Sequence, residues 1–359
     1  MKIYQLLPAL AYGDAIGNDA LAKMRALKES GFDTMIYADY LDNRLASEDV
    51  CQYDDSFKPE ADDVIIYHLS TGTKLNYKVA SYKCRKICVY HNITPPSFYN
   101  VFHTECIQNL ENGYIETKFL HDKFDTCIAD SDFNKQCLIG MGYDEKNITV
   151  IPCVIPFEDY NREPDKGTVA EYDDGLTNVV FIGRVVPNKK FEDIIRCFAH
   201  YQKNVNERSR LILAGKCIRP QYYNALKAYT DAAQVKNVVF TDGISFESII
   251  AIYKTAHIFL CMSEYEGLCV PLLEAMHFNL PIIAYKCAAI PYTMGNCGLL
   301  VDEKDPVLVS ELMDRLMNDE EFRSEVVSQQ RRRLDDFKYE NVSKKFVNFV
   351  KDFLSDGKH

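Results

Sequence analysis

The stretch SEYEGLCVPLLEA (263–275) places two glutamates, Glu266 and Glu274, eight residues apart around an apolar turn. It follows the short apolar run AHIFLCM (256–262), which predicts a buried strand. Pro271 stands where a helix can begin, because the first turn of a helix does not need the N–H that proline lacks. Glu266 is therefore expected between a strand end and a helix start, and Glu274 inside the helix.

This junction of strand and helix suits an anionic ligand. Open parallel α/β sheets bind ligands beyond the carboxyl ends of their strands, and the free N–H groups of a helix start favour negative charge. Upstream, the tract VVFIGRVVPNKK (179–190) is a β-branched strand that ends in Gly183, followed by Arg184 and, five residues on, Lys189. Both stretches together predict an α/β fold with one ligand site.

The residue types match the parts of a sugar nucleotide. A carboxylate such as Glu274 can accept hydrogen bonds from both ribose hydroxyls. A diphosphate needs a guanidinium, an ammonium and backbone N–H groups, which Arg184, Lys189 and the turn Gly267-Leu268-Cys269-Val270 could supply. Two glutamates at this spacing are common on solvated helix faces. The hypothesis of a sugar-nucleotide site therefore depends on the order of the elements, which is strand, Gly-Arg, Lys, then strand, Glu-Gly, helix and Glu.

From about Asn178 to Asp302 the chain resembles the retaining glycosyltransferases of family 4, the glycosyl transferases group 1. The segments GRVVPNKKFEDII, LILAGK, VVFTDGIS, IAIYKTAHIFLCMSEYEGLCVPLLEAMHFNLPIIAY and GNCGLLVDEKDP occur in the order typical of that family. The resemblance implies a GT-B fold, with two Rossmann-like doubly wound parallel sheets and an interdomain cleft. It also implies a retaining, hexosyltransferase-type enzyme that moves a sugar from a nucleotide-diphosphate donor to a hydroxyl acceptor.

The resemblance assigns roles to single positions of the second domain. Arg184 and Lys189 match the diphosphate-binding pair, Glu274 the ribose-binding glutamate, and Glu266 the catalytic glutamate beside the transferred sugar. Residues Gly267, Leu268, Cys269 and Val270 match the loop whose amides hold sugar hydroxyls and phosphate, and Ile244 stands where the family contacts the base through its backbone. Leu268, Cys269 and Pro291-Tyr292 depart from the commonest residues, which leaves the donor undetermined.

The first half of the chain predicts a second doubly wound domain, with strands at 3–10 and 34–38 and a helix at 18–30. The loop AYGDAIGND between them lacks the G-x-G-x-x-G pattern, which argues against a dehydrogenase. Gly17 is our candidate on the donor side, and Gly13 and Asn18 are candidates on the acceptor side. A plain tight turn is the alternative.

Two histidines end apolar strands, His68 in VIIYHLS and His91 in ICVYHNITPP. A lone histidine is more often structural. The resemblance favours His91 as a catalytic residue that faces the donor sugar, and His68 is a weaker candidate on the acceptor side. The string YHNITPP also resembles a subgroup of bacterial enzymes of surface polysaccharide biosynthesis.

The predicted domains are an acceptor-side domain (1–165), a nucleotide-sugar-binding domain (166–338) and a C-terminal helix (339–359) that packs back on the first domain. The hydrophilic stretch 161–177 is predicted to be a linker. No run of about 18 apolar residues and no signal peptide is evident, so a cytoplasmic protein without a transmembrane helix is expected.

Charge and cysteine content narrow the class further. A formal net charge of −11, from 41 basic and 52 acidic residues, argues against a nucleic-acid partner. The 13 cysteines include no C-x-x-C pair, which argues against zinc or a disulfide framework. Asp130-Ser131-Asp132 has the spacing of a metal-binding acidic motif, but it follows a strand and is interpreted as a strand end and helix cap. No metal or other cofactor is expected.

The expected partners are a nucleotide sugar and a glycan or lipid-linked glycan acceptor. The basic run from Lys74 to Lys86 is either a solvated helix face or a surface for a lipid-phosphate acceptor or anionic membrane, which would place the protein at the inner face of a membrane. Two other functions stay open: a nucleotide-sugar epimerase or phosphorylase on the same fold, and a catalytically silent partner subunit.

Overall fold

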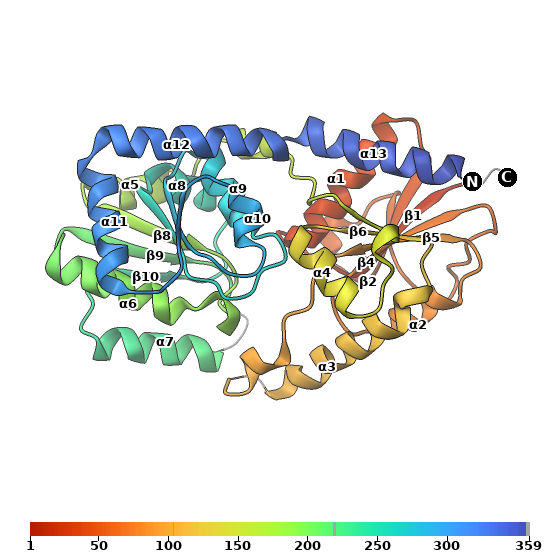
Figure 1. The fold of residues 1–359 in the computed structure, drawn as a ribbon, viewed down its shortest axis with the longest axis horizontal. Coiled ribbons are helices and arrows are strands. Elements are labelled where there is room, and N and C mark those ends of the chain that lie inside the picture. Colours follow the sequence, from red (N-terminus) through yellow and green to blue (C-terminus); the bar gives the residue numbers. More distant parts are fainter. Residues whose placement is uncertain (103, 218–219, 357–359) are drawn as a thin grey trace. The chain divides into compact units, whose positions relative to one another are not determined.

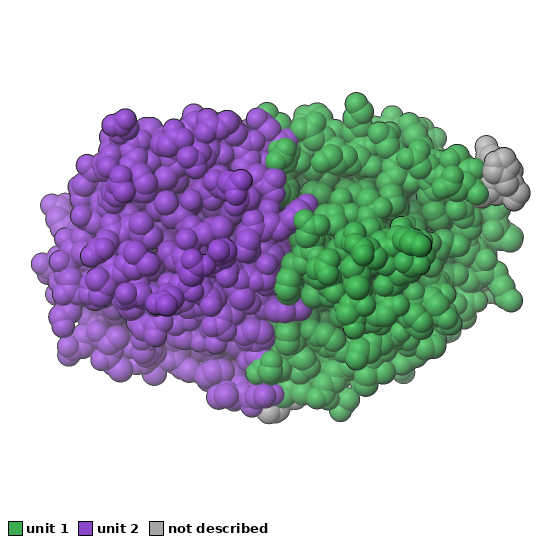
Figure 2. All heavy atoms as spheres, in the orientation of Figure 1, with its two compact units in different colours: residues 1–97, 105–156, 336–359 green, residues 98–104, 157–335 purple. Residues whose placement is uncertain are grey.

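A computed structural model describes residues 1–102, 104–217 and 220–356 of the chain. The chain forms two compact units (Figures 1 and 2). Unit 1 comprises residues 1–97, 105–156 and 336–359, and unit 2 comprises residues 98–104 and 157–335. Each unit has its own sheet.

Unit 1 is built, over its described residues, on a sheet of seven parallel strands in the order β3-β2-β1-β4-β5-β6-β7. Ile3 of β1 pairs with Thr34 of β2 on one side and with Val64 of β4 on the other, so the strand order reverses at β1. The strands are β1 (Ile3–Leu10), β2 (Thr34–Leu41), β3 (Val50–Gln52), β4 (Val64–Leu69), β5 (Arg85–Tyr90), β6 (Thr126–Ala129) and β7 (Ile148–Val150).

Both faces of the unit 1 sheet are buried, as in a parallel sheet with helices on each side. Successive side chains of β4 alternate between the faces: Ile65 and Tyr67 belong to one apolar cluster, Val64 and Ile66 to another. Its helices are α1 (Ala15–Glu29), α2 (Lys74–Ser81), α3 (Thr104–Phe119), α4 (Asp132–Gly140) and α13 (Tyr339–Ser355). The central strands of this sheet therefore have no solvent-exposed face.

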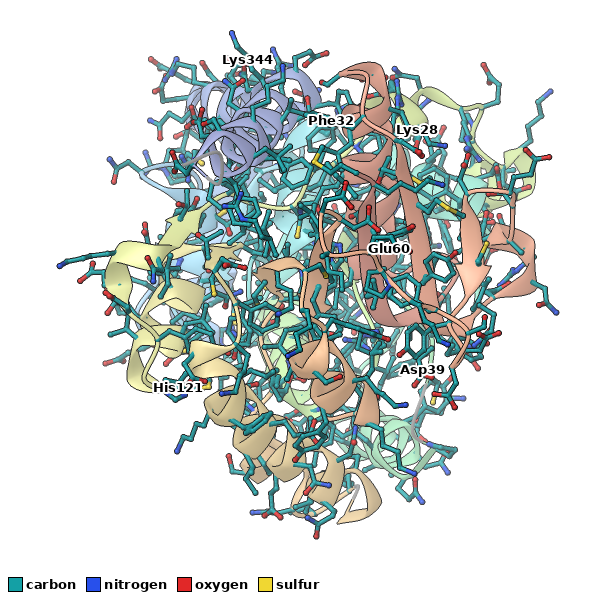
Figure 3. The ribbon with its side chains drawn as sticks, turned by 90° about the vertical axis from the view of Figure 1, so that its right-hand side faces the viewer. Lys28, Phe32, Asp39, Glu60, His121 and Lys344 are labelled. Atoms are coloured by element: carbon teal, nitrogen blue, oxygen red, sulfur yellow. The ribbon has the colours of Figure 1, made fainter. Side chains whose placement is uncertain are left out.

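Helix α13 completes the core of unit 1 although it comes from the end of the chain. Phe346, Val350 and Phe353 lie in the same cluster as Ile3 and Val64. The spacing of these residues follows the helical period, so one stripe of α13 is apolar while Lys344 on the other side is exposed (Figure 3). The last helix is thus part of unit 1 rather than an appendage.

Unit 2 is built, over its described residues, on a sheet of six parallel strands in the order β10-β9-β8-β11-β12-β13. The strands are β8 (Thr177–Ile182), β9 (Ser209–Ala214), β10 (Val238–Thr241), β11 (Ile258–Cys261), β12 (Ile282–Tyr285) and β13 (Leu299–Val301). The helices are α5 (Lys166–Tyr172), α6 (Phe191–Asn204), α7 (Pro220–Ala232), α8 (Phe246–Thr255), α9 (Val270–His277), α10 (Ile290–Met294), α11 (Pro306–Asn318) and α12 (Glu320–Leu334). The predicted fold class, two doubly wound parallel sheets, is confirmed.

Two predicted boundaries are wrong. Helix α1 begins at Ala15 rather than at Asn18, because the side chain of Asp14 accepts from the N–H groups of Ile16 and Gly17 and caps the helix earlier. The predicted linker 161–177 contains helix α5, which the side chain of Asp165 caps in the same way. In both cases an aspartate cap outweighed the glycine content of the segment.

No helix in the described parts of the chain has the length and apolarity needed to span a membrane. On unit 1, the charged side chains of Lys28, Asp39 and Glu60 are exposed (Figure 3). A location in the cytoplasm stays a prediction.

Candidate functional site

The two stretches that the sequence singled out meet in unit 2. Lys189 ends a short 3-10 helix (Pro187–Lys189) after β8, and its Nζ lies 2.6 Å and 2.5 Å from the two carboxylate oxygens of Glu266. Glu266 lies between β11 and α9, as predicted, and is 6% exposed. The expected neighbours of a diphosphate and a sugar therefore already contact one another.

Asn188 holds these two connections together, and sequence reasoning missed it. Its side-chain amide donates to the carbonyl of Tyr265 at 2.9 Å, and its own carbonyl accepts from the N–H of Glu264 at 2.9 Å. The side-chain oxygen of Asn188 is buried and has no hydrogen-bond partner among the described residues. Asn188 therefore links the segment after β8 to the segment after β11, and its side-chain oxygen remains a free acceptor among the described residues.

The charge of Lys189 is stabilised by its partner. Burial by itself lowers the pKa of Lys189, but the Glu266 carboxylate outweighs burial and the net pKa lies above its ordinary value. Arg184 opposes this shift through charge repulsion, so it lies near Lys189. Arg184 is exposed and makes no hydrogen bond or ion pair within the described residues. The site thus holds two cations against one carboxylate.

The start of α9 adds backbone donors to this site. Cys269 precedes the helix with φ +68°, a left-handed conformation that favours glycine, and no side chain caps the helix. The first-turn N–H groups of an uncapped helix attract anions. Leu268 and Cys269 are buried, and Thr293 donates its hydroxyl hydrogen to the carbonyl of Leu268. The Gly267-Leu268-Cys269-Val270 loop therefore offers its backbone, not its side chains.

Glu274 lies inside α9, as predicted, and two tyrosines orient its carboxylate. The hydroxyl of Tyr253 donates to Oε2 at 2.6 Å, and the hydroxyl of Tyr160 donates to Oε1. Burial raises the pKa of Glu274, and these two hydrogen bonds only partly offset the rise. Tyr253 in turn stacks on Phe278 at 4.9 Å between ring centroids. Tyr253 lies in the segment IAIYKTAHIFLCM but was given no role, and Tyr160 lies in none of the quoted segments, so only a rule about buried polar partners could have found their hydrogen bonds.

Ile244 is half-buried in the connection between β10 and α8. Gly243 before it has φ +67°, and Ser245 after it caps α8 by accepting from the N–H of Ser248. The predicted backbone contact to a base is untested by these contacts and stays a prediction.

The glycine candidates of unit 1 differ in their surroundings. Gly13 lies in an exposed turn with φ +76°, and a Cβ there would meet nothing within 4 Å. A Cβ at Gly17 would lie 2.9 Å from Leu10 Cδ1, so glycine lets α1 approach the end of β1. Asn18 is exposed in the first turn of α1. Gly17 has a packing reason, and the binding roles of all three residues stay predictions.

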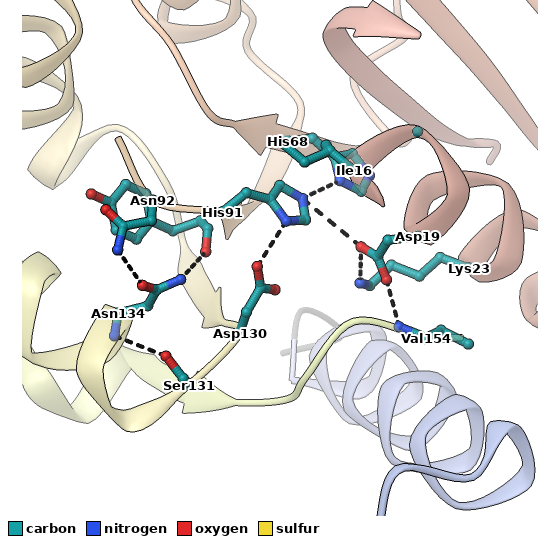
Figure 4. Close-up of polar contacts among 12 residues, drawn as sticks. Ile16, Asp19, Lys23, His68, His91, Asn92, Asp130, Ser131, Asn134 and Val154 are labelled. Atoms are coloured by element: carbon teal, nitrogen blue, oxygen red, sulfur yellow. Dashed lines mark hydrogen bonds and ion pairs between the residues drawn. The ribbon is translucent and has the colours of Figure 1, made fainter. Parts of the chain in front are cut away.

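The two histidines are hydrogen-bonded to each other. His91 Nε2 lies 2.8 Å from His68 Nδ1, and His91 Nδ1 lies 2.8 Å from Asp130 Oδ2 (Figure 4). The side chain of His91 is 2% exposed and His68 is fully buried. The roles of His91 at the donor sugar and of His68 on the acceptor side stay predictions.

The three residues of the segment Asp130-Ser131-Asp132, which follows β6, have different structural roles. The cap of α4 is Ser131, whose hydroxyl accepts from the N–H of Asn134 at 3.2 Å. Asp132 is exposed in the first turn, whereas Asp130 is buried against His91. Sequence reasoning found the cap but missed the role of Asp130 as a histidine partner.

Two groups of possible metal ligands share His91. They are Asp19–His68–His91 and His91–Asp130–Cys153, and within each group the donor atoms lie within 4.8 Å of one another. The ammonium of Lys23 pairs with Asp19 in the first group (Figure 4). Whether the chain needs a metal stays a prediction.

Most of the basic run is engaged within unit 1. Lys86 is 9% exposed and donates to the carbonyls of Tyr82 and Cys84 at 2.7 and 3.2 Å. Arg85 lies 3.7 Å from the centroid of the Phe353 ring. Lys78 pairs with Asp55 at 2.8 Å on the surface. The remaining exposed members are Lys74 and Lys83.

Comparison with known proteins agrees with the glycosyltransferase resemblance of the second half of the chain. Residues 169–333 match the model of the family described as Glycosyl transferases group 1. Over 175 residues the chain is 27% identical to the GalNAc-alpha-(1->4)-GalNAc-alpha-(1->3)-diNAcBac-PP-undecaprenol alpha-1,4-N-acetyl-D-galactosaminyltransferase of Campylobacter jejuni, covering 48% of this chain and 47% of that protein. Over 173 residues it is 22% identical to the O-antigen chain mannosyltransferase B of Escherichia coli, covering 48% and 45%. The chain spans less than half the length of both relatives.

Solved structures extend the likeness to both units. HepE from Anabaena, in complex with UDP and glucose, matches with a TM-score of 0.77 and 14% identity, over 98% of this chain and 100% of that chain. Sucrose-phosphate synthase from Thermosynechococcus elongatus matches with a TM-score of 0.78 and 15% identity, over 99% and 100%. At this identity the likeness shows the fold alone, and the fold class is GT-B.

Proposed function

Because residues 169–333 match the model of the glycosyl transferases group 1 family, we propose that this chain transfers a sugar from a nucleotide-diphosphate donor to a hydroxyl acceptor, with retention at the anomeric carbon. The acceptor is a glycan or a lipid-linked glycan, as for the Campylobacter relative whose name includes an undecaprenol diphosphate. The observation that carries this proposal is the meeting of Lys189 and Glu266 beside an exposed Arg184.

The donor diphosphate is held by fixed positive charge. Arg184 binds it through its guanidinium, Lys189 through its ammonium, and the uncapped start of α9 through backbone N–H groups. Such preorganised donors stabilise a leaving group without the reorganisation that water needs. On binding, the diphosphate takes hydrogen bonds of Lys189 that Glu266 accepts in the free protein, and the Glu266 carboxylate is freed toward the sugar.

The transfer exchanges one bond at the anomeric carbon for another on the same face. The bond from that carbon to the diphosphate oxygen breaks, and the acceptor oxygen forms the new bond. The acceptor proton passes to the leaving diphosphate. Between the two bonds the sugar has oxocarbenium character, and the Glu266 side chain, which is 6% exposed and contacts Lys189 in the free protein, stabilises that positive charge.

Glu274 binds the ribose of the donor. Tyr160 and Tyr253 fix its two oxygens, and each oxygen keeps acceptor capacity for a ribose hydroxyl. UDP in the HepE structure makes a uridine donor the first choice for testing. Lys74 and Lys83 are the exposed lysines through which the basic run would contact an anionic membrane or lipid phosphate.

An assay with a panel of nucleotide sugars tests the proposal. The full chain is incubated with UDP-, GDP- and other nucleotide sugars, with and without glycan acceptors, and the products are identified by mass spectrometry. Slow hydrolysis of one donor and faster transfer to an acceptor are expected. A change at the sugar without loss of nucleotide would indicate an epimerase, dependence on free phosphate a phosphorylase, and no reaction with bound nucleotide a silent subunit.

A further inference from the structure

The segment that carries Glu266 is fixed at Glu264, two residues before it. The N–H of Glu264 donates to the carbonyl of Asn188 at 2.9 Å, and its carbonyl accepts from the thiol of Cys287 at 3.1 Å. Asn188 follows β8 and Cys287 follows β12, the two strands on either side of β11 in the sheet. The backbone of Glu264 is therefore bound to both neighbouring strand connections.

Two lysines hold the carboxylate of Glu264. Lys304 Nζ lies 2.7 Å from Oε1, and Lys190 Nζ lies 3.2 Å from Oε2. Lys304 follows β13, and Lys190 lies between β8 and α6. Each oxygen of the carboxylate thus has a cationic partner from a connection that is distant in sequence, the arrangement of a charge-assisted hydrogen bond.

Lys304 is itself held in place by α6 and by the end of β12. Its Nζ also lies 2.7 Å from Asp193 Oδ2, and it lies 4.7 Å from the centroid of the Tyr285 ring. Its backbone carbonyl accepts from Arg196 Nη2 at 3.1 Å, and Arg196 pairs with Asp193 at 3.0 Å. The Lys304 side chain is 10% exposed, so water competes little for these contacts.

Lys190 reaches Glu264 from an unusual backbone conformation. Its φ is +53° and its ψ +51°, the left-handed region that lysine seldom occupies. Its Nζ lies 3.7 Å from Glu192 Oε1 as well. Burial lowers the pKa of Lys190, but the carboxylates of Glu264 and Glu192 outweigh burial, and the net pKa lies above its ordinary value. Such a backbone conformation persists where the surroundings fix it, and both carboxylates belong to those surroundings.

The charges linked to Glu264 by these ion pairs balance one another. Three cations face three carboxylates, namely Lys190, Arg196 and Lys304 against Glu192, Asp193 and Glu264. A balanced cluster has no net charge that would attract a further anion. The arrangement therefore suits the fixing of a loop rather than the binding of a second phosphate.

Glu264 controls the place of Glu266 because one residue, Tyr265, separates them, and neighbouring Cα atoms are about 3.8 Å apart. Two further contacts of this segment are neutral hydrogen bonds. The carbonyl of Tyr265 accepts from Asn188 Nδ2 at 2.9 Å, and the carbonyl of Glu266 accepts from the N–H of Ala289 at 3.4 Å. Charge-assisted hydrogen bonds are roughly twice as strong as neutral ones, so the lysine contacts of Glu264 contribute more to fixing this backbone than either.

We propose that Lys304 and Lys190 are positioning residues: through the carboxylate of Glu264 they fix the segment that carries the catalytic glutamate. This role rests on the proposed function, in which Glu266 stabilises the sugar of the donor. In that function the diphosphate takes hydrogen bonds of Lys189 that Glu266 accepts in the free protein. The contact of Lys304 with Glu264 involves no ligand, so it holds the segment throughout the reaction.

Lys304→Met tests this role, because methionine keeps an unbranched apolar side chain and removes the ammonium. The kcat of transfer and the slow hydrolysis of the active donor are expected to fall together by about ten- to a hundredfold, as for a misplacement of about 1 Å. The affinity for UDP and GDP is expected to change less than about twofold, because Arg184, Lys189 and the start of α9 are untouched.

Lys286→Met is the matched control. Lys286 follows β12 and pairs with Asp302 at 3.2 Å, but the two side chains are 50% and 79% exposed. Its kcat and its nucleotide affinity are expected to equal those of the wild type. A folded Lys304→Met chain with full kcat, or one that loses nucleotide affinity and keeps its kcat, would overturn the positioning role.

Glu264→Gln shows whether Lys304 acts through Glu264. The amide keeps the shape of the side chain and removes its charge, so kcat is expected to fall as in Lys304→Met. The double variant is expected to lose no more than the weaker of the two single variants, because both changes remove one contact. Losses that multiply in the double variant would refute the connection. If Lys304→Met does not fold, Glu264→Gln carries the test of kcat against affinity by itself.

Hydrogen exchange in the full chain separates this inference from the proposed function. The amides of residues 264–269 are expected to exchange about tenfold faster in Lys304→Met or Glu264→Gln than in the wild type, while β11 keeps its protection. A wild-type chain that transfers no sugar would remove the proposed function, and faster exchange in the variants would still support the fixing of the segment. Unchanged exchange in the variants would overturn that fixing whatever the activity.

Discussion

Two charged clusters, Lys189 with Glu266 in unit 2 and Lys23 with Asp19 in unit 1, are built in opposite ways. In unit 2 the side chains of Lys189 and Glu266 are 14% and 6% exposed, and nearby lies Arg184, which is exposed and has no ion pair among the described residues. In unit 1 the side chains of Lys23 and Asp19 are both 0% exposed, and each charge has its counter-charge. An excess of reachable positive charge suits an anionic ligand, whereas a sealed and neutral network suits the fixing of strands and loops.

The difference also decides what a mutation costs. Removing one partner of a buried pair leaves an uncompensated charge in a medium that solvates it poorly. When an exposed charge is removed, water solvates the partner that remains, so the fold loses little stability. Unit 1 should therefore respond to charge removal in its stability, and unit 2 chiefly in ligand affinity.

The largest effect is expected for Lys23→Ala. The substitution leaves the Asp19 carboxylate buried in unit 1 without its counter-charge. It should lower the free energy of unfolding by about 3–5 kcal/mol, measured by urea unfolding. Lys28→Ala on the same helix is the control, because its partner Asp49 is 47% exposed and such pairs contribute about 0–1 kcal/mol. Equal losses of unfolding free energy in the two variants would show that the buried ion pair and the exposed ion pair contribute alike to stability.

Removal of the unit 2 cations should act on binding. Arg184→Ala should keep the fold and weaken nucleoside diphosphate binding by about 1.5–3 kcal/mol, one charge-assisted hydrogen bond. Lys189→Ala should lose a similar affinity and also some stability, since Glu266 is left alone. Lys236→Ala, 77% exposed, is the control. Calorimetry that finds wild-type UDP and GDP affinity in both site variants would refute the diphosphate assignment.

The two glutamates should separate binding from turnover. Glu274→Ala should chiefly weaken nucleotide binding, and Glu266→Ala should cut turnover while sparing nucleotide affinity. Tyr253→Phe should weaken binding by about 0.5–1.5 kcal/mol, one neutral hydrogen bond, without the kcat loss of Glu266→Ala. Full turnover in Glu266→Ala together with lost nucleotide affinity would reverse the roles.

A smaller effect should appear in the pH dependence of stability. The folded pKa of Glu274 is raised by burial, so its protonated form is favoured by folding. Its contribution is fully present below the unfolded pKa of about 4.3 and is lost as pH rises through the raised folded pKa. Glu274→Gln should therefore gain stability relative to wild type as pH rises through that window. A constant difference between the two unfolding free energies would show that the carboxyl is not desolvated.

The smallest effect is expected from chelation. If Arg184, Lys189 and the start of α9 neutralise the leaving group, an excess of EDTA should leave transfer nearly unchanged. Activity that disappears on chelation and returns with manganese or magnesium would contradict a metal-free reaction. Loss of activity in Asp132→Asn as well would move the site to the acidic triplet after β6.

Local patterns were enough to predict the parts of the fold that depend on neighbours in sequence. The apolar run 256–262 and Pro271 predicted β11 and the start of α9, because burial of a strand and the missing N–H of proline act locally. Boundaries failed at Ala15 and Lys166, where aspartate caps began helices inside segments that glycine marked as loops.

Long-range pairing was decided only by the tertiary structure. Tyr160 and Tyr253 stand 114 and 21 residues from Glu274, and Asp130 stands 39 residues from His91, so no spacing in the sequence announces these bonds. Sequence by itself determined which residue types were present and which local elements they formed. Which polar groups became partners depended on the parallel sheets, because they bring strand ends that are distant in sequence to one edge and exclude the water that would otherwise satisfy them.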